Sequence, residues 1–164
     1  SGDIETAIKD LENEISWRLD SAPVALLNGN AGKKSVSFEG AQELFVPLQK
    51  LYRDTDGKFD PPVGRITTLW NIGTDDARVP APEEIKDAMA YVDGSQISVD
   101  GDSVNIGEGQ FLDLGAVGKG YACDKAREVL EGSDAKGACI SVGGSVLVYG
   151  EHDGNKEYKV AVKA

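Results

Sequence analysis

The residues best suited to chemistry lie in one glycine-rich segment, Phe111–Tyr121. Asp113 ends an apolar run, and Lys119 follows a turn rich in glycine at the point where a helix is expected to begin. Glycines let backbone amides approach a ligand closely, and a helix N-terminus favours negative charge. A cation in the first turn opposes the helix dipole, so we expect Lys119 to have a compensating anion, either a phosphate or Asp113.

The same segment has a second interpretation. Gly115, Gly118 and Gly120 would serve only to let the helix pack tightly on a sheet, and Lys119 would be a solvated surface charge. These residues alone support the two interpretations equally.

A stiff loop is the second feature. Residues 57–71 show neither helical nor strand periodicity, and a loop of this length in a compact domain is often functional. Pro61 and Pro62 fix its backbone, so it could present Phe59 or Trp70 to a flat aromatic ligand. Its residues alone favour the alternative, an ordinary connection whose aromatic side chains lie in the core.

Two weaker features complete the set. Ser16–Ser21 contains Trp17, and the following loop ends at Asn28; by itself Trp17 is expected to anchor the core more often than to bind a ligand. Gly143 and Gly144 interrupt two apolar runs and indicate only a turn or a bulge.

The elements that must position these residues follow from hydrophobic periodicity. We expect an amphipathic helix over residues 1–16, a second from Ser37 as N-cap to Tyr52 with a kink at Pro47, a third from Pro82 to Val92 and a fourth over 115–131. Strands are expected over 138–142, 145–149 and 157–162, with a hairpin over 96–106 that turns at Asp100-Gly101. The predicted fold is a single α+β domain over residues 1–164, an antiparallel sheet flanked by helices.

Composition excludes several classes of function. With 28 acidic and 17 basic side chains, the formal charge of −11 would repel a nucleic acid or an anionic lipid surface. No run approaches the roughly 18 apolar residues of a membrane-spanning helix. Cys123 and Cys139 are expected to be buried small hydrophobes, and His152 a solvated loop residue. No serine or cysteine is paired with a histidine in a spacing typical of triad hydrolases.

Taken together and in this order, the four features resemble the ApbE family of flavin transferases. Its members show a Ser-aromatic-basic-x-Asp-Ser opening that ends in Asn, and then a Gly-x-Phe-Asp-Pro-x-Val-Gly loop with Leu-Trp. An Asp-Leu-Gly-x-x-x-Lys-Gly-x-x-x-Asp block and a Gly-Gly turn follow. All four occur here between Ser16 and Gly150, and the block from Asp113 to Asp124 is the most specific.

The resemblance implies a chemistry. Members of the family bind FAD with magnesium, cleave its pyrophosphate and attach FMN to a threonine or serine hydroxyl of a target flavoprotein, releasing AMP. It implies FAD-binding roles for Trp17, Lys58, Phe59, Asp60, Asp113 and Lys119. It also implies that the backbone carbonyl of Ala116 is a magnesium ligand, which suits a hard ion that prefers oxygen. The catalytic residues remain unknown.

The chain also departs from the family. Pro62 stands where threonine is usual, and Arg65 where proline is usual. Family members are markedly longer, so the ApbE-like fold is expected to be incomplete. The expected missing C-terminal segment carries a histidine contact and the aspartate and threonine side chains that complete the magnesium site.

Three hypotheses remain open for the chain itself. It is part of a longer transferase or is completed by another chain; it is a non-catalytic flavin- or nucleotide-binding module; or its glycines serve packing alone and it has no flavin affinity. By resemblance, the full-length protein is expected to be an extracytoplasmic lipoprotein, anchored to the membrane by a lipid outside residues 1–164.

Overall fold

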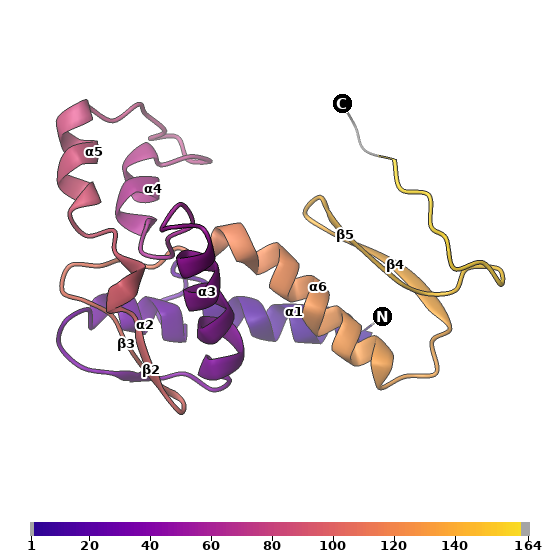
Figure 1. Cartoon of the computed structure of the whole chain (residues 1–164). Coiled ribbons are helices and arrows are strands. Elements are labelled where there is room, and N and C mark those ends of the chain that lie inside the picture. The colour runs from indigo at the N-terminus through magenta and orange to yellow at the C-terminus, as the bar shows by residue number, and fades with distance from the viewer. Residues whose placement is uncertain (1, 162–164) are drawn as a thin grey trace. The chain divides into compact units, whose positions relative to one another are not determined.

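The computed structural model describes residues 2–161 (Figure 1). The helices are α1 (Gly2–Ile15), α2 (Pro23–Gly29), α3 (Ala41–Asp54), α4 (Gly64–Trp70), α5 (Pro82–Met89) and α6 (Gly115–Glu131), with a short 3-10 helix η1 (Gly94–Gln96). The strands are β1 (Val36–Ser37), β2 (Ser98–Asp100), β3 (Ser103–Asn105), β4 (Gly137–Val142) and β5 (Ser145–Gly150). They form two antiparallel sheets, in the orders β1-β3-β2 and β4-β5, so the predicted α+β class is confirmed.

The chain divides into two compact units. One runs from Asn13 to Leu114, and the other holds the described residues up to Glu12 and from Gly115 onward. We call them the middle unit and the terminal unit. The single domain predicted over residues 1–164 stays a prediction.

The middle unit is built on the three-stranded sheet. β2 and β3 form the predicted hairpin, and Gly101 takes a positive φ of 56° at its turn. β1 pairs with β3 from the other side, so that Val36 lies opposite Val104. Among the buried side chains of this unit are Phe38, Phe45, Ile106 and Leu112. The two phenylalanine rings meet edge to face with centroids 5.3 Å apart.

The predicted start of the second helix is wrong. Ser37 does not cap a helix, because it lies in β1 and pairs with Ser103. The backbone N–H of Phe38 donates to Asp102 O, and α3 begins only at Ala41, after Gly40 at a φ of 70°. Pro47 lies within α3 as predicted.

Two short helices, α2 and α4, were not predicted from the sequence. α2 begins with Pro23, a residue whose fixed φ suits the first turn. α4 lies inside the stretch predicted to be a loop, and Asn71, the residue after its end, has a φ of 48°. Each spans seven residues, too few for helical periodicity to stand out.

α5 begins at Pro82 as predicted, and a carboxylate anchors its start. Glu84 accepts a hydrogen bond from the backbone N–H of Ala81 at 2.8 Å and two from the Arg78 guanidinium at 2.7 Å each. The Arg78 hydrogen bonds, followed by that from Ala81, lower the pKa of Glu84 to about 2.

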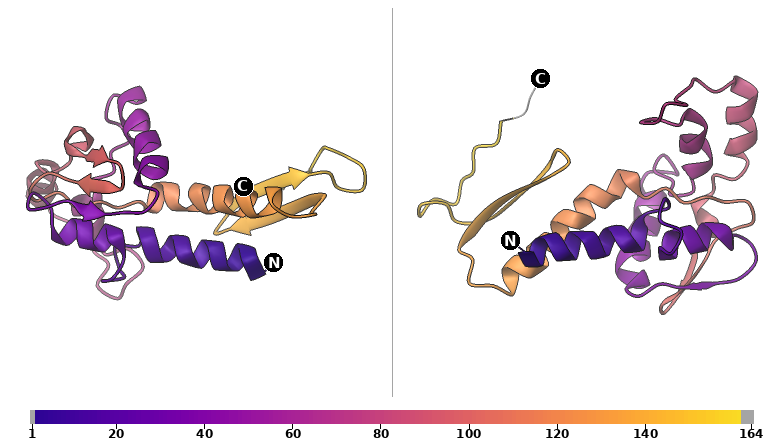
Figure 2. Two further views of the ribbon diagram at one scale, coloured as in Figure 1. Left: turned by 90° about the horizontal axis from the view of Figure 1, so that it is seen from below. Right: turned by 180° about the vertical axis from the view of Figure 1, so that it is seen from behind.

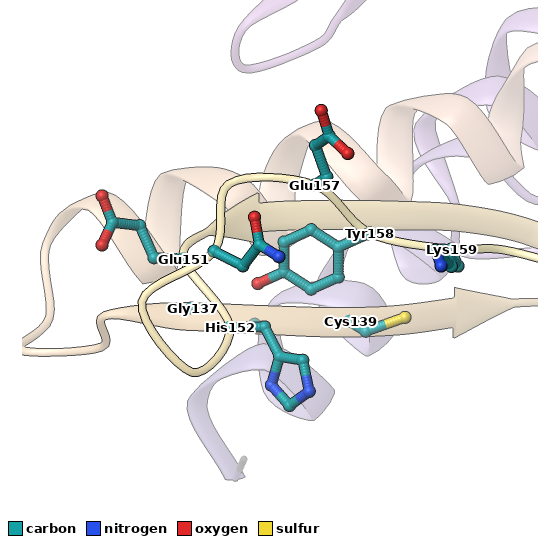
Figure 3. A pocket seen from close by; sticks show the side chains of 9 residues that line it. Gly137, Cys139, Glu151, His152, Glu157, Tyr158 and Lys159 are labelled. Carbon is teal, nitrogen blue, oxygen red and sulfur yellow. The ribbon is translucent and has the colours of Figure 1, made fainter.

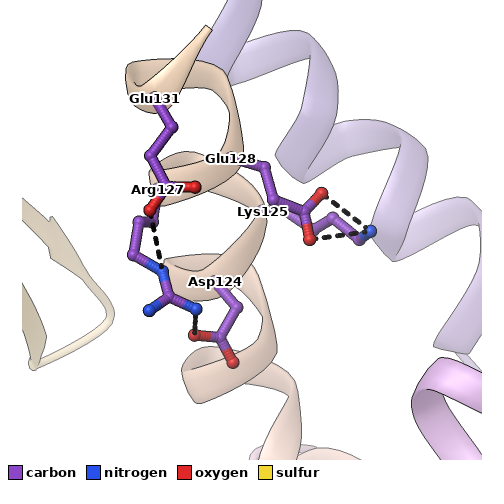
Figure 4. Close-up of polar contacts among 5 residues, drawn as sticks. All are labelled: Asp124, Lys125, Arg127, Glu128 and Glu131. Carbon is purple, nitrogen blue, oxygen red and sulfur yellow. Dashed lines mark hydrogen bonds and ion pairs between the residues drawn. The ribbon is translucent and has the colours of Figure 1, made fainter.

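In the terminal unit, α6 packs beside the β4–β5 hairpin (Figures 1 and 2). Helix and hairpin agree with the prediction within one residue. Ion pairs on the surface of α6 join Asp124 to Arg127 at 3.3 Å and Lys125 to Glu128 at 3.1 Å (Figure 4). Such exposed pairs contribute little stability. No helix within residues 2–161 is long and apolar enough to cross a membrane.

Two expectations for the terminal unit are wrong. Residues 157–161 form no strand, and residue 162 lies outside the described residues. A strand needs a partner for its backbone groups, whereas here the Tyr158 hydroxyl ties the segment to Tyr149 O at 2.7 Å. Cys139 is exposed on β4 rather than buried, and Cys123 is half-buried. His152 is exposed, as predicted.

Candidate functional site

Asn28 holds the segment that leads into the candidate site. Its side-chain amide donates to Leu112 O at 3.1 Å, and its side-chain oxygen accepts from Leu112 N–H at 2.7 Å. Leu112 is completely buried. One amide side chain at the end of α2 therefore satisfies both backbone groups of a buried residue 84 positions away.

The proline-rich loop holds the same segment from its other side. Asp113 N–H donates to Pro61 O, and Gly64 N–H donates to Phe111 O, both at 3.0 Å. The side-chain hydroxyl of Thr67, on α4, donates to Asp113 Oδ2 at 2.7 Å. Three of the four sequence features thus meet at residues 111–113, within the middle unit.

Gly64 is required where the loop meets this segment. A Cβ atom at position 64 would lie 2.4 Å from Phe111 Cδ1 and 2.6 Å from Phe111 O. Real Cβ atoms essentially never approach other atoms so closely. The absence of a side chain lets the start of α4 touch the Phe111 backbone.

Trp17 packs against this segment. Its ring meets that of Phe111 edge to face, with centroids 5.4 Å apart, and the Arg18 guanidinium lies 4.1 Å from the Trp17 ring centroid. Trp17 is half-buried. The sequence placed Phe111 only at the edge of its motif; the structure makes it the contact point for both Trp17 and Gly64.

The three predicted loop residues lie in different surroundings. Lys58 is exposed, and Phe59 is half-buried, with its backbone N–H bonded to Thr55 Oγ1 at 3.1 Å. Asp60 Oδ2 accepts from Gly94 N–H at 3.2 Å, while its Oδ1 is buried without a hydrogen-bond partner among the described residues. Burial raises the pKa of Asp60; the Gly94 hydrogen bond opposes that shift and nearby Asp93 adds to it.

This raised pKa predicts a pH dependence of stability. Between the ordinary pKa of an aspartate and the raised one, the folded chain binds more protons than the unfolded chain, so stability falls as pH rises through that window. Asp60→Asn removes the titrating group. We expect the melting temperature of the wild type to fall relative to that of Asp60→Asn as the pH rises from about 4, the ordinary pKa of an aspartate. A constant difference between the two melting temperatures would contradict this.

The terminal unit holds the remaining predicted residues. Ala116 and Lys119 are exposed in the first turns of α6. A Cβ on Gly143 would lie 3.0 Å from Lys119 Cδ, so the lysine stem lies close to Gly143. Gly143 and Gly144 have positive φ, of 53° and 97°. Within the described part of this unit, no acidic side chain forms an ion pair with Lys119.

The described residues do not make a magnesium site by themselves. No group of three or more histidine, cysteine, aspartate or glutamate side chains within residues 2–161 is arranged to hold a metal ion. The Ala116 carbonyl has the right donor chemistry for magnesium, but a single carbonyl does not fix the ion.

The described residues of each unit line a hollow. That of the middle unit, of about 360 Å³, is lined by residues that include Asn28, Arg65 and Phe111, next to the held segment. That of the terminal unit, of about 640 Å³, lies between the β4–β5 hairpin and the segment that follows it (Figure 3). Its lining includes Cys139, His152 and Tyr158 but none of the predicted site residues. The smaller hollow is therefore the one associated with the candidate site.

The fold and the site define an α+β protein in which the glycine-rich start of α6 follows a tightly held apolar segment. The profile of the ApbE family matches residues 1–164, and the chain belongs to that family.

Curated relatives agree with this assignment. The chain is 29% identical over 160 residues to the FAD:protein FMN transferase of Treponema pallidum (strain Nichols), an alignment that covers 90% of this chain and 43% of that protein. It is 31% identical over 178 residues to the Escherichia coli (strain K12) protein of the same name, covering 94% of this chain and 49% of the relative. The chain thus spans about half the length of the curated relatives it matches.

Solved structures share the fold. The ApbE protein of Thermotoga maritima superposes with a TM-score of 0.90 at 28% identity, over 98% of this chain and 54% of that one. The apo form of the flavinyl transferase ApbE from Pseudomonas stutzeri gives 0.87 at 23% identity, over 99% and 52%. The predicted family is confirmed.

Proposed function

We propose that this chain forms part of the flavin site of an FAD:protein FMN transferase. The observation that supports this proposal is that Asn28, residues 61–67 and Trp17 all contact residues 111–113. The names of the curated relatives support FAD as the substrate and a protein as the acceptor.

The proposed transfer is a substitution at a phosphorus atom of FAD. A threonine or serine hydroxyl of the target attacks the phosphorus of the FMN half of FAD, and the phosphoanhydride bond to AMP breaks. The hydroxyl loses its proton, FMN becomes bound through a phosphoester, and AMP leaves with the bridging oxygen. Such reactions depend mainly on positioning and on neutralising phosphate charge.

The residues of this chain have two tasks in that proposal. Lys119 supplies an ammonium group for the diphosphate, at the start of a helix whose N–H groups also favour an anion. Asp113 contacts FAD from a backbone held by Pro61. Magnesium, when bound, would neutralise phosphate charge, with the Ala116 carbonyl as one ligand.

A second candidate is a flavin-binding module without transferase activity. The names of the curated relatives, which are transferases, do not favour it. Titrating the chain with FAD, with and without magnesium, and then assaying FMN attachment to a target protein separates the two. Binding without transfer supports the module, whereas no binding at millimolar protein rejects both.

Lys119→Ala tests the assignment of the phosphate contact. We expect FAD affinity to fall by about 1.5–3 kcal/mol, the range for a hydrogen bond to a charged group, with an unchanged melting temperature. Fluorescence titration of FAD gives the affinity. Lys125→Ala is the matched control, because that ammonium lies on the same helix and pairs with Glu128. Equal FAD affinity of the wild type and Lys119→Ala would show that Lys119 is a solvated surface residue that does not contact the phosphate.

A further inference from the structure

The hydroxyl of Thr67 has one proton and two acceptors within reach. Asp113 Oδ2 lies 2.7 Å from it, and Gly64 O, one turn back along α4, lies 3.3 Å from it. The shorter distance and the negative charge of a carboxylate both favour donation to Asp113. The proton that a helical threonine commonly gives to its own helix is here directed to a residue 46 positions away.

The neighbouring threonine behaves in the ordinary way. The Thr68 hydroxyl donates to Gly64 O at 2.8 Å and lies 3.3 Å from Arg65 O, so its contacts are within α4. Two adjacent threonines with different acceptors make the Thr67 contact a specific feature of its position.

Asp113 is thus held both at its backbone and at its carboxylate. Its backbone N–H is fixed to Pro61 O, and its carboxylate is fixed to Thr67. An aspartate held at the backbone alone still rotates about two side-chain bonds, whereas a second attachment at the carboxylate restricts both. A restricted side chain loses less conformational entropy when a ligand binds.

We propose that Thr67 is a positioning residue for the flavin site, whose hydroxyl holds the Asp113 carboxylate in one orientation before FAD binds. This rests on the proposed function, since the family resemblance supplies the contact between Asp113 and FAD. Thr67 acts through Asp113 and is not itself placed against the nucleotide.

Thr67→Val is the direct test, because valine keeps the shape and removes the hydroxyl. We expect FAD affinity to fall about 3- to 10-fold, as for the loss of one ordinary hydrogen bond. Thr67→Ser restores the hydroxyl and is expected to recover most of the affinity. Thr68→Val is the matched control and is expected to leave the affinity unchanged. Fluorescence titration of the whole chain with FAD measures all four proteins.

A measurement without FAD separates this inference from the proposed function. The three-bond Hα–Hβ couplings of Asp113 in NMR spectra report its rotamer. We expect one dominant rotamer in the wild type and Thr67→Ser, and averaged couplings in Thr67→Val. Unchanged couplings in Thr67→Val would overturn the positioning role.

The NMR couplings and the FAD titration test different parts of the proposal. Averaged couplings in Thr67→Val together with an unchanged FAD affinity would show that Thr67 orients Asp113 but that this orientation does not contribute to FAD binding. That result would overturn the proposed role of Thr67 in the flavin site. A wild-type chain that binds no FAD would overturn the proposed function and, with it, the role of Thr67 toward the nucleotide, while the couplings would still decide whether Thr67 orients Asp113.

Discussion

Asn28→Ala is expected to destabilise the chain by about 2–6 kcal/mol. The substitution removes both hydrogen bonds to the Leu112 backbone and leaves a buried N–H and a buried C=O without partners. Each unsatisfied buried group costs about 1–3 kcal/mol. Leu112 is completely buried, so water reaches these groups only if the segment moves. Urea unfolding followed by circular dichroism measures the loss.

Asn30→Ala is the matched control for this prediction. The Asn30 side chain donates to Leu26 O at 2.7 Å, so it bonds a backbone carbonyl of its own helix in an exposed position. Its removal is expected to change stability by no more than about 0.5 kcal/mol. A similar loss in both variants would show that the Leu112 backbone groups find other partners.

Weakened FAD binding should accompany the loss of Asn28. The freed segment carries Asp113, and binding then has to order a chain that the wild type already holds. The affinity should be compared at a temperature where both proteins are folded. A folded Asn28→Ala variant that keeps its full FAD affinity would show that FAD binding does not depend on the hydrogen bonds by which Asn28 holds residues 111–113.

The sequence predicted most of the long elements. α1, α6 and the β4–β5 hairpin carry regular patterns over many residues, and Pro82 with its two following glutamates marked the start of α5. The errors fall where a tertiary contact overrides the local signal. Ser37 has the chemistry of an N-cap, yet pairing with Ser103 keeps it in a strand.

The candidate site was only partly visible in the sequence. The ApbE-like motifs supplied the segments that meet at residues 111–113, including the asparagine that ends the first motif. No local pattern could reveal that Asn28 bonds the backbone of Leu112, or that Thr67 reaches Asp113, because each contact joins residues far apart in the chain. Thr67 was hidden further because α4 was expected to be a loop.

Gly64→Ala is expected to destabilise the chain strongly, although it adds only one methyl group. The added methyl would overlap the Phe111 ring and its backbone oxygen, and the backbone oxygen cannot move without breaking its hydrogen bond from Gly64 N–H. Overpacking in a buried position costs about 1–3 kcal/mol or more. We expect a loss of about 3 kcal/mol in urea unfolding, together with weaker FAD binding, because the displaced segment carries Asp113.

Gly120→Ala is the matched control for Gly64→Ala, because it adds the same methyl group to another helical glycine. No described atom outside its immediate surroundings lies within 4 Å of a Cβ built there. Alanine is also the better helix former, so this variant is expected to gain up to about 1 kcal/mol. Opposite signs for the two substitutions would locate the cost in the contact with Phe111 rather than in the backbone freedom of glycine. A loss of similar size at both positions would instead show that Gly64 is needed for its flexibility, and that the close approach to residues 111–113 does not depend on a missing side chain.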